Sequence, residues 1–225
     1  MALLIVATPI GNSLDISARA LECLKNAETI ILEEFKESTT FLRSHGISGK
    51  KYEQLNEHST PADIERLAGL CATEDIPLIT DCGTPGFCDP GADLVRLCRK
   101  NKTAVRTLPG PSSLMAILSL SSVRLDQFLF RGFISNETET RKKDWAELVK
   151  EKRAFLIMDT PYRFQKTLQE IKEYIPKRKC LLAINVTAVD ELIVEDFGEK
   201  ILNATLPNKA EFILLVYPDA SSANR

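Results

Sequence analysis

The amino-acid sequence predicts an α/β protein, and two features of its pattern support this. Short apolar runs alternate with helix-like segments along the chain, and loops rich in glycine and proline follow several of the apolar runs. Alternation of this kind is typical of domains built on a mostly parallel sheet. With 225 residues, of which 44% are hydrophobic, the chain is long enough for one large or two compact domains.

The first half of the chain alternates between predicted strands and predicted helices. Three signals mark helix ends: Asp15 as an N-cap, Pro61 in a first turn and Gly46 as a closing residue. The predicted strands are 3–7, 29–34, 76–80 and 103–110, the last running into a loop, and the predicted helices are 15–27, 38–47, 61–72, 92–102 and 111–122.

The second half repeats the alternation after a change in composition. Residues 128–133 form a predicted strand, and the abruptly polar segment 135–152 that follows indicates a domain boundary nearby. We therefore expect one α/β domain over residues 1–120 and a second over residues 128–219. The other predicted elements are strands over 154–160, 179–187 and 210–218, a helix over 161–175, and a strand followed by a short helix over 189–202.

The composition excludes several classes of function. A formal net charge of −2 gives no global basic field, so any contact with RNA would be local. The six cysteines are scattered without C-x-x-C spacing, and neither a secretory signal nor an apolar run of about 20 residues is present. We expect a cytoplasmic protein with reduced thiols, no membrane span and no metal; Cys82 and Cys88 lack further ligands nearby.

Three loops leave the carboxyl ends of predicted strands: Thr8–Asn12, Thr80–Gly91 and Pro109–Ser113. Ligands of open α/β sheets collect at this edge, and glycines there allow close approach of the backbone. The loops therefore predict one shared ligand site, or else they are ordinary tight turns in which Asp89 and Ser112 cap helices. Neither a P-loop nor a G-x-G-x-x-G motif occurs, which disfavours a nucleoside triphosphate or a dinucleotide.

The segments that carry these loops resemble a known family. VATPIGNSLDISARALECL, TDCGTPGFCDPGADLVRLC and LPGPSSLMAIL match, in order and spacing, the signature segments of the tetrapyrrole (corrin/porphyrin) methylase superfamily. Within it, the chain is most similar to the bacterial 16S ribosomal RNA cytidine 2′-O-methyltransferases. The similarity continues through FLFRGF and MDTPYR to EFILLV, so it covers nearly the whole chain.

The resemblance implies a two-domain fold and a cofactor. The expected N-terminal domain has a mostly parallel sheet and the cofactor loops, the C-terminal domain has a mixed sheet and closes the cleft, and S-adenosylmethionine (S-adenosyl-L-methionine) lies between them. The resemblance also implies a homodimer. The implied cofactor-binding residues are Pro9, Ile10, Gly83, Thr84, Phe87, Ser112 and Ser113 from the first domain, and Met158, Ala183, Asn185 and Glu211 from the second.

The predicted acceptor side differs from the pattern of the RNA enzymes. Their E-D-T-R segment corresponds here to Glu33, Glu34, Phe35 and Lys36, and their A-R-E-L-T-K segment to residues 183–188, AINVTA. A ribose hydroxyl is a weak nucleophile at neutral pH, so a nearby carboxylate or basic group would help to remove its proton. We therefore take Glu33, Glu34 and Lys36 as candidate catalytic residues, with solvated surface charges as the alternative.

Three functions follow from these observations. The first is S-adenosylmethionine-dependent methylation of ribosomal RNA, with the small ribosomal subunit as a possible partner. The alternatives are methylation of a tetrapyrrole or another small acceptor, and a non-catalytic protein that binds the cofactor.

Three further features bear on substrate binding and assembly. The basic cluster Arg141, Lys142 and Lys143 could contact phosphates or could be a solvated helix start. Asn56 and Glu57 match an N-E pair of the RNA enzymes. The apolar helix over 111–122 must be covered by the second domain or by a second subunit.

Overall fold

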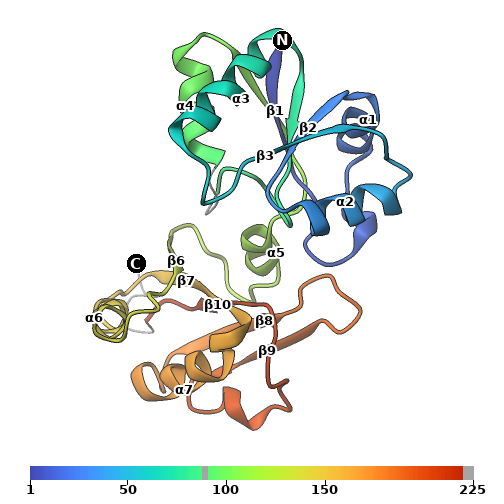
Figure 1. Ribbon diagram of the computed structural model, residues 1–225. Helices are drawn as coiled ribbons and strands as arrows, with labels where there is room; N and C mark the ends of the chain where they lie inside the picture. The colour runs from blue at the N-terminus through green and yellow to red at the C-terminus, as the bar shows by residue number, and fades with distance from the viewer. Residues whose placement is uncertain (88–90, 220–225) are drawn as a thin grey trace. The chain divides into compact units, whose positions relative to one another are not determined.

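The computed structural model describes residues 1–87 and 91–219. The chain divides into two compact units, Met1–Ser112 and Ser113–Arg225, and each contains a five-stranded sheet (Figure 1). The division falls at Ser112 rather than after residue 120, because helix α5 (Ser113–Ser119) packs against strand β10 (Phe212–Val216) of the second unit. The prediction of an α/β fold is confirmed.

The first sheet is entirely parallel, as the alternating pattern predicted. Its strand order is β3-β2-β4-β1-β5, so the chain crosses over at every connection. Strand β3 was not predicted, because it is a four-residue edge strand of polar sequence, KYEQ, that pairs only with β2. The strands are β1 (Ala2–Val6), β2 (Thr29–Leu32), β3 (Lys51–Gln54), β4 (Ile76–Leu78) and β5 (Ala104–Leu108).

Helices cover both faces of this sheet. Successive residues of a strand point to opposite faces, so Leu3 and Ile5 pack with apolar residues of α3 and α4, while Val6 packs with residues of α1 and α2. Figure 1 shows the two helix pairs on either side of the strands. The helices are α1 (Ala18–Asn26), α2 (Phe35–Ser44), α3 (Pro61–Thr73) and α4 (Gly91–Lys100).

The helix starts correct one prediction and confirm another. Asp15 does not cap α1; it ends a 3-10 turn over Ser13–Asp15, and the Ser17 side chain accepts the hydrogen bond from the Ala20 N–H instead. Pro61 does occupy the first turn of α3, preceded by a reciprocal capping box between Thr60 and Asp63.

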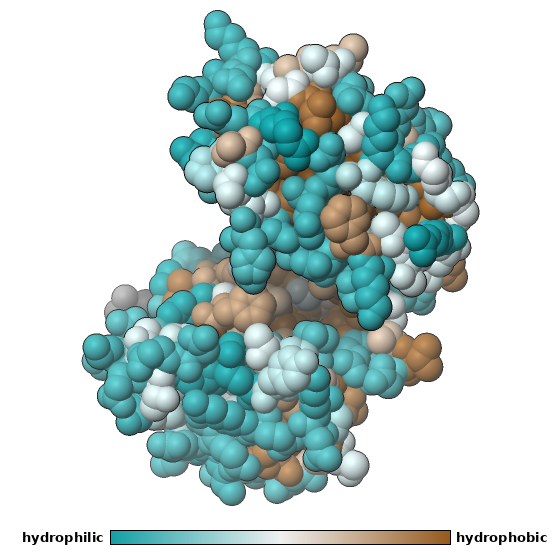
Figure 2. Space-filling view, in the orientation of Figure 1, coloured by the Kyte–Doolittle hydropathy of each residue, from teal (hydrophilic) through white to brown (hydrophobic). Residues whose placement is uncertain are grey.

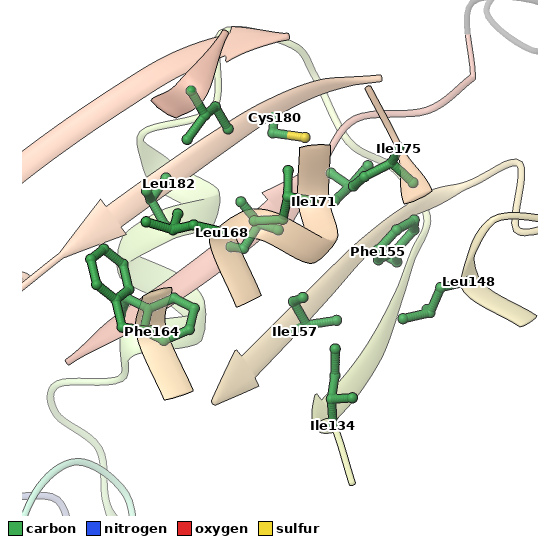
Figure 3. Packing of buried hydrophobic residues seen from close by; sticks show 14 of the residues in the cluster. Ile134, Leu148, Phe155, Ile157, Phe164, Leu168, Ile171, Ile175, Cys180 and Leu182 are labelled. Atoms are coloured by element: carbon green, nitrogen blue, oxygen red, sulfur yellow. The ribbon is translucent and has the colours of Figure 1, made fainter. Parts of the chain in front are cut away.

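The second sheet is mixed, as expected. Its order is β6-β7-β10-β8-β9, with β6 and β7 parallel and the other pairs antiparallel. One face packs against α6 and α7; Figure 3 shows Phe164, Leu168 and Ile171 of α7 beside Phe155 and Ile157 of β7. The remaining elements are β6 (Phe128–Phe133), α6 (Thr138–Leu148), β7 (Ala154–Asp159), η2 (Pro161–Arg163), α7 (Phe164–Tyr174), β8 (Lys179–Ile184), β9 (Leu192–Phe197) and η3 (Ile201–Asn203).

Helix α5 is only partly covered within its own unit. Ile117 is fully buried, whereas Met115 is 62% exposed and lines a hollow of about 420 Å³ together with Leu118, Val123 and Phe128. The second unit therefore accounts for one side of this apolar helix.

The visible surface of each unit is largely hydrophilic, with single hydrophobic side chains between the polar ones (Figure 2). No helix in residues 1–87 or 91–219 has the length and apolar character needed to cross a membrane. Cys23, Cys71, Cys82, Cys98 and Cys180 are free thiols, whereas Cys88 and Asp89 lie outside the described residues.

Candidate functional site

Two of the three predicted loops are joined by backbone hydrogen bonds in the first unit. Thr8 and Gly83 form an isolated antiparallel bridge, in which the Thr8 N–H donates to the Gly83 carbonyl at 2.8 Å and the Gly83 N–H donates back at 3.1 Å. The buried Thr8 hydroxyl also donates to the Thr80 carbonyl at 3.2 Å. The loop after β1 is therefore fixed to the loop after β4.

The third loop lies against both of the others. The Thr84 hydroxyl donates to the Pro111 carbonyl at 3.1 Å. Gly110 approaches the first loop so closely that a Cβ built on it would lie 3.0 Å from the Ala7 Cβ. The three loops therefore lie together at one edge of the sheet, and their shared ligand site stays a prediction.

Two of the glycines in the second loop have conformations that side chains rarely adopt. Gly83 and Gly86 have φ values of +80° and +84°. A Cβ on Gly83 would lie 3.5 Å from Ile10 Cγ2, whereas one on Gly86 would meet nothing within 4 Å. Among residues 1–87 and 91–219, no atom fills the space beside the Gly86 Cα, and the half-exposed Phe87 follows it. This surface can receive a ligand that is partly apolar and partly recognised by the backbone.

The predicted catalytic residues follow β2, at the same edge of the sheet. The Glu33 carboxylate accepts from the Asp81 N–H at 3.4 Å, and the Glu33 carbonyl accepts from the Gln54 side chain at 3.0 Å. Glu34 precedes the first residue of α2 and makes no side-chain capping bond. Glu34 and Lys36 are both exposed, so their charged ends are accessible to an acceptor.

Asp81 is a site residue that the sequence reasoning missed. Its carboxylate accepts from the Ser38 hydroxyl at 3.3 Å and from the Glu34 N–H, which ties the loop after β4 to the start of α2. Desolvation and the nearby charges of Glu37 and Glu34 raise the pKa of Asp81. The available signal was its position directly after a strand, where polar residues of a parallel sheet meet a ligand. Asp81 positions the segment that carries Glu33, Glu34 and Lys36.

The N-E pair has a local structural role. The Asn56 side chain accepts from the His58 N–H at 3.0 Å, and Glu57 lies 3.6 Å from the exposed His58 ring. These contacts form the turn before α3.

In the second unit, two of the predicted cofactor residues lie on one face of the sheet. Met158 of β7 and Ala183 of β8 both pair with Ile213 of β10, so the three side chains form a row across adjacent strands. This row faces away from the core formed with α6 and α7, because the neighbouring positions Ile157 and Leu182 point into that core.

The other two predicted cofactor residues lie at the end of that sheet. The Asn185 N–H donates to the Glu211 carbonyl at 2.9 Å, which places the residues side by side. The loop that begins at Asn185 is strained, since Asn185 and Thr187 have φ values of +46° and +67° without being glycine. The Asp190 carboxylate accepts from the Asn185 side chain, and the Glu191 carboxylate accepts from the Thr187 N–H.

Arg141 is not part of a phosphate-binding cluster. Its side chain is only 2% exposed and lies 2.8 Å from the Asp159 carboxylate and 2.6 Å from that of Glu170. Lys142 pairs with Glu139 on the surface, so only Lys143 of the predicted cluster is exposed without an ion pair among the described residues. Arg141 is neither a phosphate contact nor part of a solvated helix start, because two carboxylates from other elements draw its guanidinium into the unit.

Comparison with known proteins identifies the family. The model of the family described as Tetrapyrrole (Corrin/Porphyrin) Methylases matches residues 2–201. The chain belongs to this family. It is 36% identical to Ribosomal RNA small subunit methyltransferase I of Rickettsia prowazekii, across 99% of this chain and 80% of that protein. It is 33% identical to the protein of the same name from Neisseria meningitidis serogroup B, across 96% of this chain and 76% of that protein.

Solved structures of the tetrapyrrole methylase fold confirm the architecture. Diphthine synthase superposes with a TM-score of 0.74 at 14% identity, covering 97% of this chain and 90% of that one. Uroporphyrin-III C-methyltransferase from Thermus thermophilus, complexed with S-adenosyl homocysteine, superposes with a TM-score of 0.64 at 13% identity, covering 96% and 97%. This family member is thus a methyltransferase, and the family uses S-adenosylmethionine.

The residues present fit this methyl donor. Its purine and ribose need apolar and hydrogen-bonding surface, which Ile10, Phe87 and the backbone beside Gly86 provide in the first unit. Met158 and Ala183 provide apolar surface in the second unit, with the polar groups of Asn185 and Glu211 beside them. When bound, S-adenosylmethionine supplies an electrophilic methyl group. The role of each of these residues in binding S-adenosylmethionine stays a prediction.

Proposed function

We propose that this chain transfers a methyl group from S-adenosylmethionine to a ribose 2′-hydroxyl of small-subunit ribosomal RNA. The observation that carries the proposal is the similarity to the small-subunit ribosomal RNA methyltransferases of three bacterial genera, at 32–36% identity across 96–99% of the chain. With this substrate, we propose a cytoplasmic location.

The carboxylates at the edge of the first sheet suit this reaction. A ribose hydroxyl must lose its proton as its oxygen bonds to the methyl carbon and the carbon–sulfur bond breaks, leaving S-adenosylhomocysteine. Glu34 is exposed and makes no capping hydrogen bond, so it can accept that proton and later release it to water. Lys36, in the first turn of α2, supplies a positive charge for an RNA phosphate.

The test is transfer of labelled methyl from S-adenosylmethionine to small ribosomal subunits from a strain that lacks this methylation. Label at a single ribose, identified by mass spectrometry of the RNA, supports the proposal. Label on a tetrapyrrole but not on subunits or naked RNA at any salt concentration would overturn it in favour of a small acceptor. Cofactor binding without transfer to any acceptor would favour a non-catalytic protein.

Cofactor binding gives a separate prediction. Isothermal titration should show that S-adenosylhomocysteine binds without added metal and that Gly83→Val abolishes binding. Valine strains a backbone with φ of +80° and presses on Ile10, which distorts the loop rather than blocking the ligand directly.

Gly46→Val is the matched control. Gly46 has a similar φ of +72° and lies after α2, and a Cβ added to it would meet nothing within 4 Å. This variant should be destabilised to a similar extent yet still bind the ligand. Equal loss of binding in both variants would mean that general destabilisation, not the loop, explains the effect.

We also propose that the protein acts as a homodimer, as the family resemblance implies. The exposed side of α5, with Met115 and the hollow of about 420 Å³ beside it, is apolar surface that a second subunit could cover. Sedimentation at micromolar concentration should give about twice the mass of 25.1 kDa. A single species at the monomer mass would contradict this.

A further inference from the structure

Several loops of the second sheet lie together at the edge where β7 and β8 end and β10 begins, and not all of their residues belong to the predicted cofactor site. The carboxyl ends of β7 and β8 lie at the same edge as the amino end of β10, because β10 is antiparallel to both. The loop after β7 carries Tyr162, the loop after β8 begins at Asn185, and the loop before β10 carries Lys209. The predicted cofactor residues Asn185 and Glu211 lie at this edge as well.

Tyr162 and Lys209 form an exposed pair at this edge. Tyr162 is 83% exposed, although its ring has a large apolar surface. The Lys209 ammonium lies 3.6 Å from the centroid of the ring, which is a close cation–π contact. The ammonium covers one side of the ring, and its charge lies at the surface of the unit. A ligand at this surface can therefore contact an aromatic ring and a cation at the same time.

Contacts within the unit fix both members of the pair. Arg163, the next residue after Tyr162, donates from Nε to the buried Asp159 carboxylate at 2.6 Å. The segment before Lys209 is held by Gln165 of α7, whose side chain donates to the Pro207 carbonyl at 2.8 Å. Because both backbones are anchored, little conformational entropy is lost when a ligand binds.

We propose that the Tyr162–Lys209 pair binds a nucleotide of single-stranded RNA, with the base stacked on the tyrosine ring and the phosphate paired with the lysine. Stacking on an exposed aromatic ring is the way in which proteins bind unpaired bases, and a neighbouring cation neutralises the backbone. This inference rests on the proposed function, for which it supplies a contact to the acceptor in the second unit.

The surrounding charges restrict the kind of ligand. Glu211 lies two residues from Lys209, and the loop after β8 carries Asp190 and Glu191, whose side chains are occupied by hydrogen bonds within that loop. The edge is therefore not a general anion-binding surface. A ligand that gains from stacking as well as from one phosphate contact fits it better than an inorganic anion.

The experiment measures, by anisotropy, binding of a fluorescent, unstructured single-stranded RNA of about 12 nucleotides and mixed sequence. Tyr162→Ala should weaken binding about tenfold or more, whereas Tyr162→Phe, which keeps the ring, should stay within about twofold. Lys209→Ala should weaken binding. It should also reduce the slope of log affinity against log salt concentration by about one, the value expected for one lost phosphate contact. Affinity for S-adenosylhomocysteine should not change in any of these variants.

Phe197→Ala is the matched control. Phe197 is 44% exposed and has a lysine, Lys200, 5.7 Å from its ring centroid, but it ends β9 at the opposite edge of the sheet. RNA binding that depends on Tyr162 but not on Phe197 supports the inference, even if no methyl is transferred. Unchanged binding by Tyr162→Ala, equal loss in both alanine variants, or no RNA binding by the wild type would overturn it. Failure of the transfer assay alone bears on the proposed function.

Discussion

Replacing Arg141 by methionine should lower the free energy of unfolding of the second unit by about 3–5 kcal/mol. Arg141 lies within 2.8 Å of the Asp159 carboxylate and also pairs with Glu170 and donates to Thr167. Methionine fills much of the same volume but leaves two carboxylates, one of them fully buried, without this partner. The loss of unfolding free energy therefore comes mainly from the desolvated carboxylates left without a cation, and not from lost packing.

Urea unfolding followed by tryptophan fluorescence measures this effect. Trp145 is the only tryptophan in the chain, and its indole N–H donates to Glu170 at 3.0 Å, so its emission reports on the second unit. Lys142→Ala is the control, because Lys142 forms an exposed, solvent-screened ion pair with Glu139 whose loss should change stability little. Similar small changes in both variants would show that the buried network does not stabilise the unit.

The same network makes stability depend on pH. Burial alone would raise the pKa of Asp159, but hydrogen bonds from Arg163 and Arg141 outweigh this and hold it below its ordinary value. The stabilisation is therefore complete above the unfolded pKa of about 3.9 and is lost as the pH falls through the lower folded value. Between pH 5 and pH 3, the wild type should lose more stability than Arg141→Met. Parallel pH profiles would contradict this.

Replacing Glu34 by glutamine should lower kcat for methyl transfer to small ribosomal subunits by about 10²-fold or more. Glutamine keeps the size of the side chain and the start of α2 but cannot accept the hydroxyl proton. Since Glu34 makes no capping hydrogen bond, the substitution should leave folding unchanged. Affinity for S-adenosylhomocysteine should be unchanged as well.

Glu37→Gln tests whether charge alone explains such a loss. Glu37 lies in the first turn of the same helix, is exposed, and contributes to the raised pKa of Asp81 as Glu34 does. It should retain most of the activity, because it lies farther along α2 from the strand ends. If Glu34→Gln keeps full kcat, or if both variants lose activity equally, Glu34 does not accept the proton.

Much of the fold was determined by local pattern. Apolar runs such as residues 3–7 and glycine-rich loops such as residues 80–87 predict strands and turns without knowledge of their partners, because backbone geometry and burial of one face act over a few residues. The order of these segments also determined the family. The edge strand β3 escaped prediction, since its sequence KYEQ contains no apolar run and the strand is defined by its pairing with β2.

Tertiary structure decided which charged side chains were available for function. In sequence, Arg141 and Lys142 are alike, yet Arg141 is buried between Asp159 and Glu170 while Lys142 remains at the surface. Likewise, Tyr162 and Lys209 are 47 positions apart in the numbering and meet because β10 begins beside the residue at which β7 ends. Desolvation and charge pairing depend on distances in space, so a local pattern can name candidate residues but cannot tell which of them will find partners.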